Sequence, residues 1–215
     1  MRGRAGEPAS VVFASFDPSQ LYHFDRQART CAIALAAALG IDTSLSLNFL
    51  PKSLDTLPDA VSSTIEAAHA VSIPLQQIIL EITENEIIHD PLRFASMMNV
   101  YRAQGLRFAI DDFGAGYSGL NLLADFQPDI VKLDIQLVRS IDSNGPRQAI
   151  VRALVQACDD LGIDVLAEGV ETYAEQRWFR RIGVELFQGY LYARPAFEAL
   201  PQPLLPAAVE ALAAR

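Results

Sequence analysis

The sequence predicts a parallel α/β fold, and three features of the 215-residue chain support this prediction. Near-continuous apolar runs, typical of parallel strands covered on both faces, alternate with amphipathic segments of helical length. Glycines end most of these helical segments one or two residues before the next strand. Polar residues stand at the carboxyl end of almost every strand. Alternation alone leaves a doubly wound sheet and a (β/α)8 barrel open, and the polar strand ends favour the barrel, in which they converge.

The first predicted helix starts at Asp17-Pro18, where an N-cap aspartate precedes a first-turn proline. The same pair, Asp90-Pro91, starts an amphipathic helix that continues to Gln104, and a further helix is expected over Pro146–Leu161. Val11–Phe16 is open between an additional strand and a loop. Six strands are predicted, centred near Leu47, Leu80, Ala109, Val131, Leu166 and Phe187. The glycines predicted to end helices are Gly40, Gly105, Gly162 and Gly183.

The composition indicates one soluble domain over residues 1–215. The net charge of −9 argues against a DNA-coating protein, which needs a basic face. It does not exclude a phosphate-bearing ligand, because bound metal can supply positive charge. The longest apolar run, Cys31–Leu39, is far shorter than the ~18 residues that a membrane span needs. Two cysteines without metal-ligand spacing suit a reducing compartment, so we expect a cytoplasmic protein.

The most informative segment is Phe108–Ser118, in which a buried-looking strand runs into two adjacent carboxylates and a glycine-rich loop. Asp111 and Asp112 repel each other unless a cation lies between them. The glycines that follow let the backbone turn sharply and leave room for a ligand. This segment therefore predicts a divalent metal site rather than a solvated turn.

Oxygen ligands at other strand ends extend this predicted site. Asn48, Glu81 and Glu168 end three further strands, and each acidic group taken alone would be a surface carboxylate at a strand–helix junction. Together with the two aspartates they suit a pair of hard divalent cations that activate a water and stabilise a leaving oxygen. Lys132 lies in an apolar strand and forms either a buried ion pair with Asp134 or, because buried lysine is rare, a functional contact to that water.

Six motifs in this order resemble the EAL-domain family of cyclic di-GMP phosphodiesterases, over nearly the whole chain. Any one of them alone would be a weak signal, whereas the ordered set is specific. They are SLNF (46–49), LEITE (80–84), IDDFGAGYS (110–118), VKLD (131–134), AEGVET (167–172) and FQGY (187–190). Residues 1–27 are most similar to EAL domains that follow blue-light-sensing flavin modules.

The resemblance implies a modified TIM barrel whose first strand is antiparallel, and hydrolysis of cyclic di-GMP to linear pGpG. It implies a homodimer and an upstream sensory domain in the full-length protein. It implies Lys132 touching the catalytic water, Glu171 supporting the site, and Glu84 anchoring the loop 112–118 near the family's dimer contact. Substrate-binding roles are implied for Arg2, Asp134 and Gln188, although Gln188 equally suits a core amide. The implied ligands of two Mg²⁺ or Mn²⁺ ions are Asn48, Glu81, Asp111, Asp112 and Glu168, with Asp111 bridging.

The sequence departs from the family at its signature, Glu-Ala-Leu-x-Arg. Arg2 matches the signature's arginine, and the metal-binding glutamate would lie just before residue 1. We therefore expect a barrel without its first strand, poorly stable and weakly active in isolation, with upstream coding sequence cut off. The triplet Glu198-Ala199-Leu200 is a decoy that we expect to begin a closing helix.

Two alternative functions are weighed against the phosphodiesterase. A missing glutamate favours a non-catalytic module that senses cyclic di-GMP or docks a partner protein, whereas the other ligands favour the phosphodiesterase. An unrelated metal-dependent barrel enzyme, such as an aldolase, would not explain the ordered motifs. Metal-dependent hydrolysis with product analysis separates the three.

Overall fold

The computed structural model describes residues 11–12, 16–55, 57, 59–83, 91–116 and 119–204. Within these ranges the chain forms one sheet of six parallel strands in sequential order. Each strand contains the residue on which the sequence pattern centred it, so the predicted parallel α/β fold is confirmed. The strands are β1 (Leu45–Asn48), β2 (Ile78–Thr83), β3 (Arg107–Phe113), β4 (Ile130–Leu133), β5 (Asp164–Glu168) and β6 (Leu186–Gln188).

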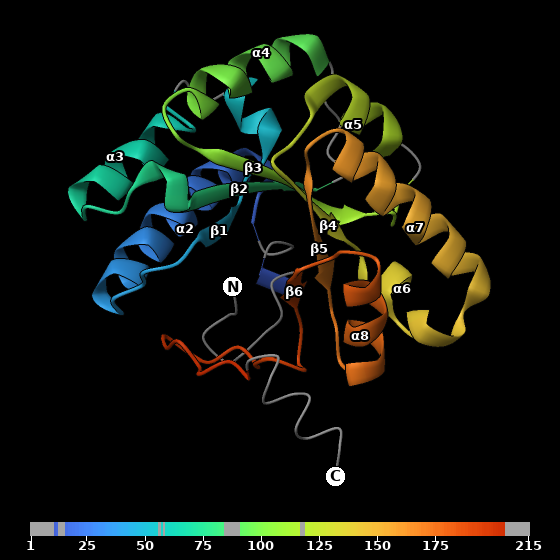
Figure 1. Ribbon diagram of the computed structural model, residues 1–215. Coiled ribbons are helices and arrows are strands. Elements are labelled where there is room, and N and C mark those ends of the chain that lie inside the picture. Colours follow the sequence, from blue (N-terminus) through green and yellow to red (C-terminus); the bar gives the residue numbers. More distant parts are fainter. Residues whose placement is uncertain are drawn as a thin grey trace.

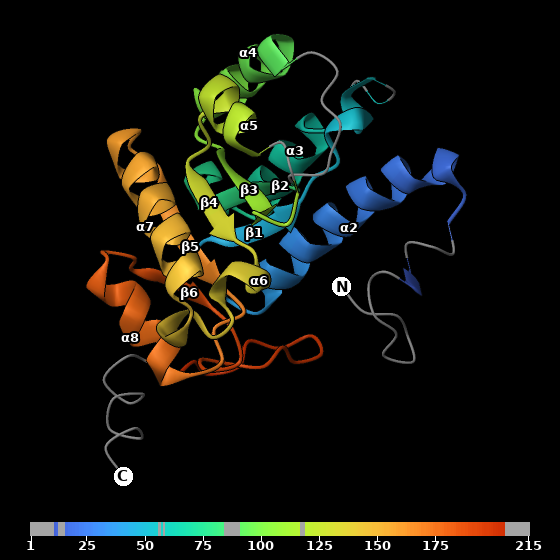
Figure 2. The same cartoon turned by 90° about the vertical axis from the view of Figure 1, so that its right-hand side faces the viewer.

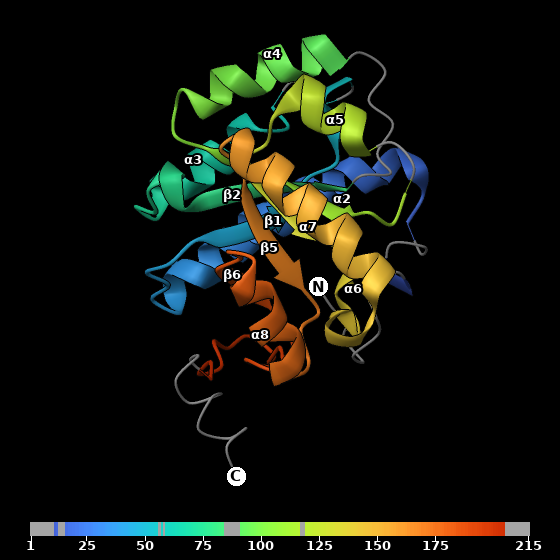
Figure 3. The ribbon, with the colours of Figure 1, turned by 45° about the vertical axis from the view of Figure 1, so that its right-hand side comes forward.

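The long helices lie in an arc outside the curved sheet, which forms a half-barrel (Figure 1). A quarter-turn of the molecule shows the strands between α2 on one side and α7 and α8 on the other (Figure 2), and an intermediate view shows α7 crossing in front of the strands (Figure 3). Helices on one face exclude a doubly wound sheet, which is covered on both faces. The helices are α2 (Pro18–Ala38), α3 (Ser62–Ala70), α4 (Pro91–Arg102), α5 (Gly119–Phe126), α6 (Ile135–Val138), α7 (Gly145–Asp160) and α8 (Tyr173–Arg181), with short 3₁₀ turns η1 (Pro51–Asp55), η2 (Leu75–Gln77) and η3 (Ile141–Ser143).

Two sets of buried side chains among the described residues distinguish the two faces of the sheet. The larger core lies between the strands and the helices and includes Leu80 and Phe108. Because successive side chains of a strand point to opposite faces, their neighbours point the other way. Ile79, Ala109 and Ile130 accordingly form a smaller cluster on the concave face of the half-barrel. The next inward-facing position along each strand carries a polar side chain, which places the candidate site directly above this apolar floor.

The helix boundaries lie close to the residues predicted to start and end the helices. Helix α2 begins at Pro18, and α4 begins at Pro91, whose expected cap Asp90 lies outside the described residues. The four glycines predicted to end helices all have positive φ, as a left-handed helix terminus requires. Val11 and Val12, open between a strand and a loop, are helical.

The prediction of a closing helix at Glu198 is wrong. Glu198 lies in a turn with φ of 45°, and Ala196 and Ala199 form an isolated antiparallel bridge around it. Prolines at positions 195, 201 and 203 explain the difference. Proline lacks a backbone N–H donor, and it disfavours helical backbone at the residue before it.

Candidate metal and ligand site

The polar strand ends meet on the concave face because the strands are parallel and in register. Asn48 of β1 pairs with Glu81 of β2, and Glu168 of β5 pairs with Gln188 of β6. Leu47 belongs to the core beneath the helices, so Asn48 points to the concave face. The predicted ligands of the described strands are thus brought to one face. Two predicted site residues, Arg2 and Glu84, lie outside the described residues, and their roles stay predictions.

A bulge in β3 explains how two consecutive aspartates serve one site. In a regular strand, Asp111 and Asp112 would point to opposite faces. The pairing of β3 with β4 instead shifts register between Ile110 and Phe113, and Asp112 adopts φ of 53°, a left-handed conformation that aspartate tolerates better than most residues. The bulge turns Asp112 back towards its neighbour, and one oxygen each of Asp111, Asp112 and Glu168 lies within 4.8 Å of the others.

This cluster fits a divalent cation by its chemistry as well as its spacing. All its donors are hard carboxylate oxygens, the ligands that Mg²⁺, Mn²⁺ and Ca²⁺ prefer. Burial raises the pKa of Glu168 to about 7, and neighbouring Asp111 adds to the rise while Lys132 opposes it. Burial also raises the pKa of Asp112, and the charges of Asp111 and Asp134 act in the same direction. Crowded carboxylates of this kind need a cation to stay ionised together.

Lys132 supplies one positive charge from within the sheet. Its ammonium nitrogen lies 2.7 Å from Asp111 Oδ1, 3.1 Å from Glu81 Oε1 and 3.5 Å from Glu168 Oε2. Burial alone would lower the pKa of Lys132, but these three carboxylates outweigh that effect and raise it above its ordinary value. The expected alternative, an ion pair with Asp134, is not formed among the described residues.

Asp134 has a different structural role. Its carboxylate accepts a hydrogen bond from the Gln136 backbone N–H at 2.8 Å and caps the short helix α6. A lysine two residues before an aspartate would lie on the same face of a regular strand, which made the pair plausible from sequence. Asp134 instead follows the end of β4, so the alternation that the expectation assumed no longer applies.

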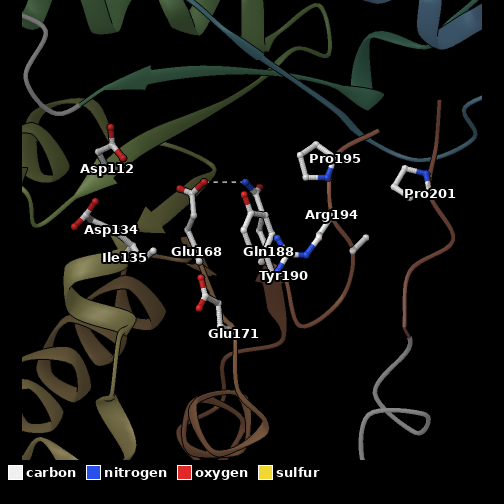
Figure 4. A pocket seen from close by; sticks show the side chains of 13 residues that line it. Asp112, Asp134, Ile135, Glu168, Glu171, Gln188, Tyr190, Arg194, Pro195 and Pro201 are labelled. Atoms are coloured by element: carbon white, nitrogen blue, oxygen red, sulfur yellow. Dashed lines mark hydrogen bonds between the residues drawn. The ribbon is translucent and has the colours of Figure 1, made fainter. Parts of the chain in front are cut away.

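A cavity of about 580 Å³ opens beside the acidic cluster (Figure 4). Four of the predicted site residues, Asp112, Asp134, Glu168 and Glu171, line this cavity. Gln188 also lines it, and its Nε2 donates to Glu168 Oε1 at 2.8 Å, so it is not a core amide bonded to the backbone. Tyr190 lies beside Gln188, and Arg194, Pro195 and Pro201 lie on the far side from Asp112 and Asp134 (Figure 4).

Several residues around this cavity were missed from the sequence. Arg194 lies over the Tyr190 ring, 4.2 Å from its centroid. Tyr190 stands inside the FQGY motif, so an aromatic residue directly after a glycine at a strand end was an available signal. Arg139 pairs with Glu171 through both terminal guanidinium nitrogens, with Nη2 at 2.9 Å, and this hydrogen bonding lowers the pKa of Glu171. No sequence motif pointed to Arg139, because its partner is 32 residues away.

Gly169 lets two loops approach closely at the cavity wall. It has φ of +71°, and a Cβ there would lie 2.6 Å from Ile135 Cγ1. Gly162 has nearly the same φ, +70°, but nothing among the described residues lies within 4 Å of its Cβ position. Substitutions at these two glycines therefore share the same backbone strain, and only the substitution at Gly169 adds a steric overlap.

Gly169→Ala is expected to destabilise the protein more than Gly162→Ala. The strain of a left-handed alanine costs ~1–2 kcal/mol at either position. Overlap with Ile135 adds ~1–3 kcal/mol at Gly169 only. Urea unfolding of both variants measures the difference, and equal losses would show that Ile135 moves aside freely.

The sequence matches the EAL domain over residues 4–195, most of the chain. The chain belongs to the EAL domain family. The domain is 37% identical over 195 residues to the blue light- and temperature-regulated antirepressor BluF of Escherichia coli (strain K12), covering 90% of this chain and 48% of BluF. It is 32% identical over 161 residues to the cyclic di-GMP phosphodiesterase RocR of Pseudomonas aeruginosa, covering 74% of this chain and 40% of RocR. The chain thus spans about half or less of these curated relatives.

Solved EAL structures resemble this domain closely. A standalone versatile EAL protein from Vibrio cholerae O395, bound to cyclic di-GMP, matches with a TM-score of 0.88 at 44% identity, covering 94% of this chain and 85% of that chain. Klebsiella pneumoniae BlrP1, in a complex with manganese and cyclic di-GMP, matches with a TM-score of 0.85 at 42% identity, covering 92% of this chain and 50% of that chain. None of the helices in the described part of this domain is long and apolar enough to cross a bilayer.

Proposed function

We propose that this EAL domain hydrolyses one phosphodiester bond of cyclic di-GMP and releases linear pGpG. The observation that carries the proposal is the carboxylate cluster of Asp111, Asp112 and Glu168 at the edge of a 580 Å³ cavity. The proposal is also supported by membership of the EAL family, by similarity to the phosphodiesterase RocR, and by a complex of a similar EAL protein with cyclic di-GMP. A cavity of this volume is in the usual range for small-molecule sites.

Mg²⁺ or Mn²⁺ is the proposed cofactor, and BlrP1 with manganese supports this choice. The proposed metal ligands are Asn48, Glu81, Asp111, Asp112 and Glu168. Bound in pairs, such ions activate water and stabilise the leaving oxygen of a phosphodiester.

The domain's own residues would orient the reactants. The Lys132 ammonium donates towards the space between the carboxylates, where it can hydrogen-bond an attacking water. Gln188 fixes one oxygen of Glu168 and leaves its other oxygen directed at Lys132. Glu171 and Asp134 line the cavity on the same wall, where they can accept hydrogen bonds from the dinucleotide.

The deciding experiment incubates the purified domain with cyclic di-GMP and Mg²⁺ or Mn²⁺ and follows the nucleotides by chromatography. We expect pGpG to appear with metal, to be absent with a chelator, and to be lost in Asp111→Asn, which keeps the side-chain shape but removes the charge. Folded wild-type protein that gives no pGpG would refute the proposal.

A second candidate is a non-catalytic module that binds cyclic di-GMP or a partner protein, and the likeness to the antirepressor BluF favours it. Binding of cyclic di-GMP without turnover would support this candidate. Homodimerisation, a cytoplasmic setting and a sensory domain in the full-length protein are also proposals. Light scattering coupled to gel filtration tests the dimer.

A further inference from the structure

The cavity wall that carries Asp134 and Glu171 is built from two loops that touch along a seam. We define the seam as residues 134–140, which follow β4 and include α6, against residues 169–175, which follow β5 and include the start of α8. Ile135 packs on Gly169, and Arg139 pairs with Glu171 across it. Figure 4 shows Asp134, Ile135, Glu168 and Glu171 following one another along this wall. Whatever fixes the seam therefore fixes one side of the cavity.

Glu175 is the buried group at the centre of the seam. Its side chain does not line the cavity, and the residue is only 2% exposed. Its Oε1 accepts the Ser140 backbone N–H at 2.9 Å, and its Oε2 accepts those of Glu171 and Thr172, both at 3.0 Å. One carboxylate thus holds backbone groups from both loops. Charge-assisted bonds of this kind are stronger than bonds between neutral groups.

The Ser140 backbone needs such a partner. Ser140 adopts φ of 56°, a left-handed conformation that is costly for a residue with a Cβ and persists only where its surroundings impose it. Its N–H donates to the Glu175 carboxylate, and the carbonyl of the preceding residue, Arg139, accepts from Arg147 Nη1 at 2.8 Å. Both polar groups of the peptide bond between Arg139 and Ser140 are therefore held by side chains. Arg147 holds the carbonyl, and Glu175 holds the N–H.

The Arg139–Glu171 ion pair cannot fix the seam alone. Its side chains are 45% and 36% exposed, and pairs at that exposure contribute little to stability. Glu175 instead binds the backbone of Glu171 itself and of Ser140, the residue after Arg139. The two ends of the ion pair are placed opposite each other by the buried carboxylate behind them.

We propose that Glu175 is a positioning residue for the dinucleotide cavity, holding the loops that carry Asp134 and Glu171 at the separation that the ligand needs. The proposal rests on the proposed function for the identity of the ligand. Loss of Glu175 would widen or loosen the wall without removing any group that touches the ligand. Such a change should weaken binding of cyclic di-GMP more than it slows its turnover.

The test compares Glu175→Gln with Thr172→Ala. Glutamine keeps the shape but replaces one acceptor oxygen by an NH₂ group, so it cannot serve both Ser140 and the Glu171–Thr172 pair. Thr172 Oγ1 accepts the Glu175 backbone N–H at 3.2 Å, so Thr172→Ala weakens the start of α8 and leaves all three carboxylate bonds in place. The control therefore weakens the start of α8 while keeping the three bonds by which Glu175 joins the two sides of the seam.

Two readouts are compared, amide hydrogen exchange at Ser140 by NMR and the Kd for cyclic di-GMP measured with Ca²⁺, an ion also found with this ligand in BlrP1. We expect Glu175→Gln to speed exchange at Ser140 by ~10-fold or more and to raise the Kd by ~10-fold, because small misplacements of binding groups cost this much or more. Thr172→Ala should change each value by less than ~3-fold. Glu175→Asp, which keeps the charge but is too short to reach both loops, replaces Glu175→Gln if the latter fails to fold.

Ser140 protection that survives in Glu175→Gln would overturn the proposal, and so would a Kd no higher than that of Thr172→Ala. A wild-type domain that does not bind cyclic di-GMP would instead overturn the proposed function, and with it the ligand named here. The first two results concern the variant and the third concerns the wild type, so the two failures are distinguishable.

Discussion

Replacing Lys132 with methionine is expected to lower the free energy of unfolding by ~3–5 kcal/mol, because it removes the cation from a buried group of carboxylates. The ammonium lies within 3.5 Å of oxygens of Glu81, Asp111 and Glu168. Lys132 and Glu81 are almost fully buried, so water cannot take over the lost interaction. Chemical denaturation without metal measures this change directly.

Arg107→Met is the matched control for Lys132→Met. Arg107 also lies in the sheet and pairs with an acidic residue, Asp164, at 3.3 Å, but this pair is exposed. Its loss should cost less than ~1 kcal/mol. Equal effects of the two substitutions would mean that the carboxylates around Lys132 are solvated or protonated at no cost.

Added Mn²⁺ should stabilise Lys132→Met more than it stabilises the wild type, since a divalent ion can satisfy the same carboxylates. Hydrolysis should nevertheless fall by ~10²–10³-fold, the range for losing one preorganised hydrogen-bond donor from an active site. Restored stability together with lost turnover would separate the structural role of Lys132 from its proposed role in chemistry.

The strands and most of the site could be predicted from sequence for one physical reason. Parallel strands bring their carboxyl ends to the same edge, so polar residues that end apolar runs must meet there. Asn48, Glu81 and Glu168 were assigned to the site in this way, and the structure brings their strand ends to one face. The orientation of Asp112 could not be predicted in this way. Two adjacent strand residues share a face only through a bulge, and nothing in the sequence marks a bulge at Ile110–Phe113.

The supporting residues could not be predicted because their partners are remote in the chain. Arg139 and Glu175 each bind groups more than 30 residues away, so the local sequence pattern does not indicate these hydrogen bonds. The error at Glu198 has the opposite cause. The expected helix rested on the place of the triplet after the last strand, and the prolines that follow it, at positions 201 and 203, disfavour helical backbone there.

Arg29 donates to the Asn48 carbonyl at the end of β1, at 3.4 Å, and Arg29→Met is expected to cost ~3–5 kcal/mol of stability. Arg29 is 2% exposed and forms an ion pair with buried Asp25. It also donates to Thr64 Oγ1 at 3.1 Å and to the Ala60 carbonyl at 2.8 Å. Burial raises the pKa of Asp25 and the charge of Arg29 opposes that rise, so removing the arginine leaves a carboxylate that must either be protonated or be buried uncompensated.

Arg26→Met is the matched control, because Arg26 lies one turn earlier in α2. It makes the same change in helix propensity and surface charge but leaves the buried network of Arg29 intact. Arg26 pairs with Asp59, a partly exposed contact, and its loss should cost less than ~1 kcal/mol. Adding Asp25→Asn to Arg29→Met should recover part of the lost stability, because the double variant no longer buries an unpaired charge. Urea unfolding of the four proteins of this cycle measures the coupling between the two residues. A double variant no more stable than Arg29→Met would locate the cost in the lost bonds to Ala60 and Thr64, and not in the uncompensated charge of Asp25.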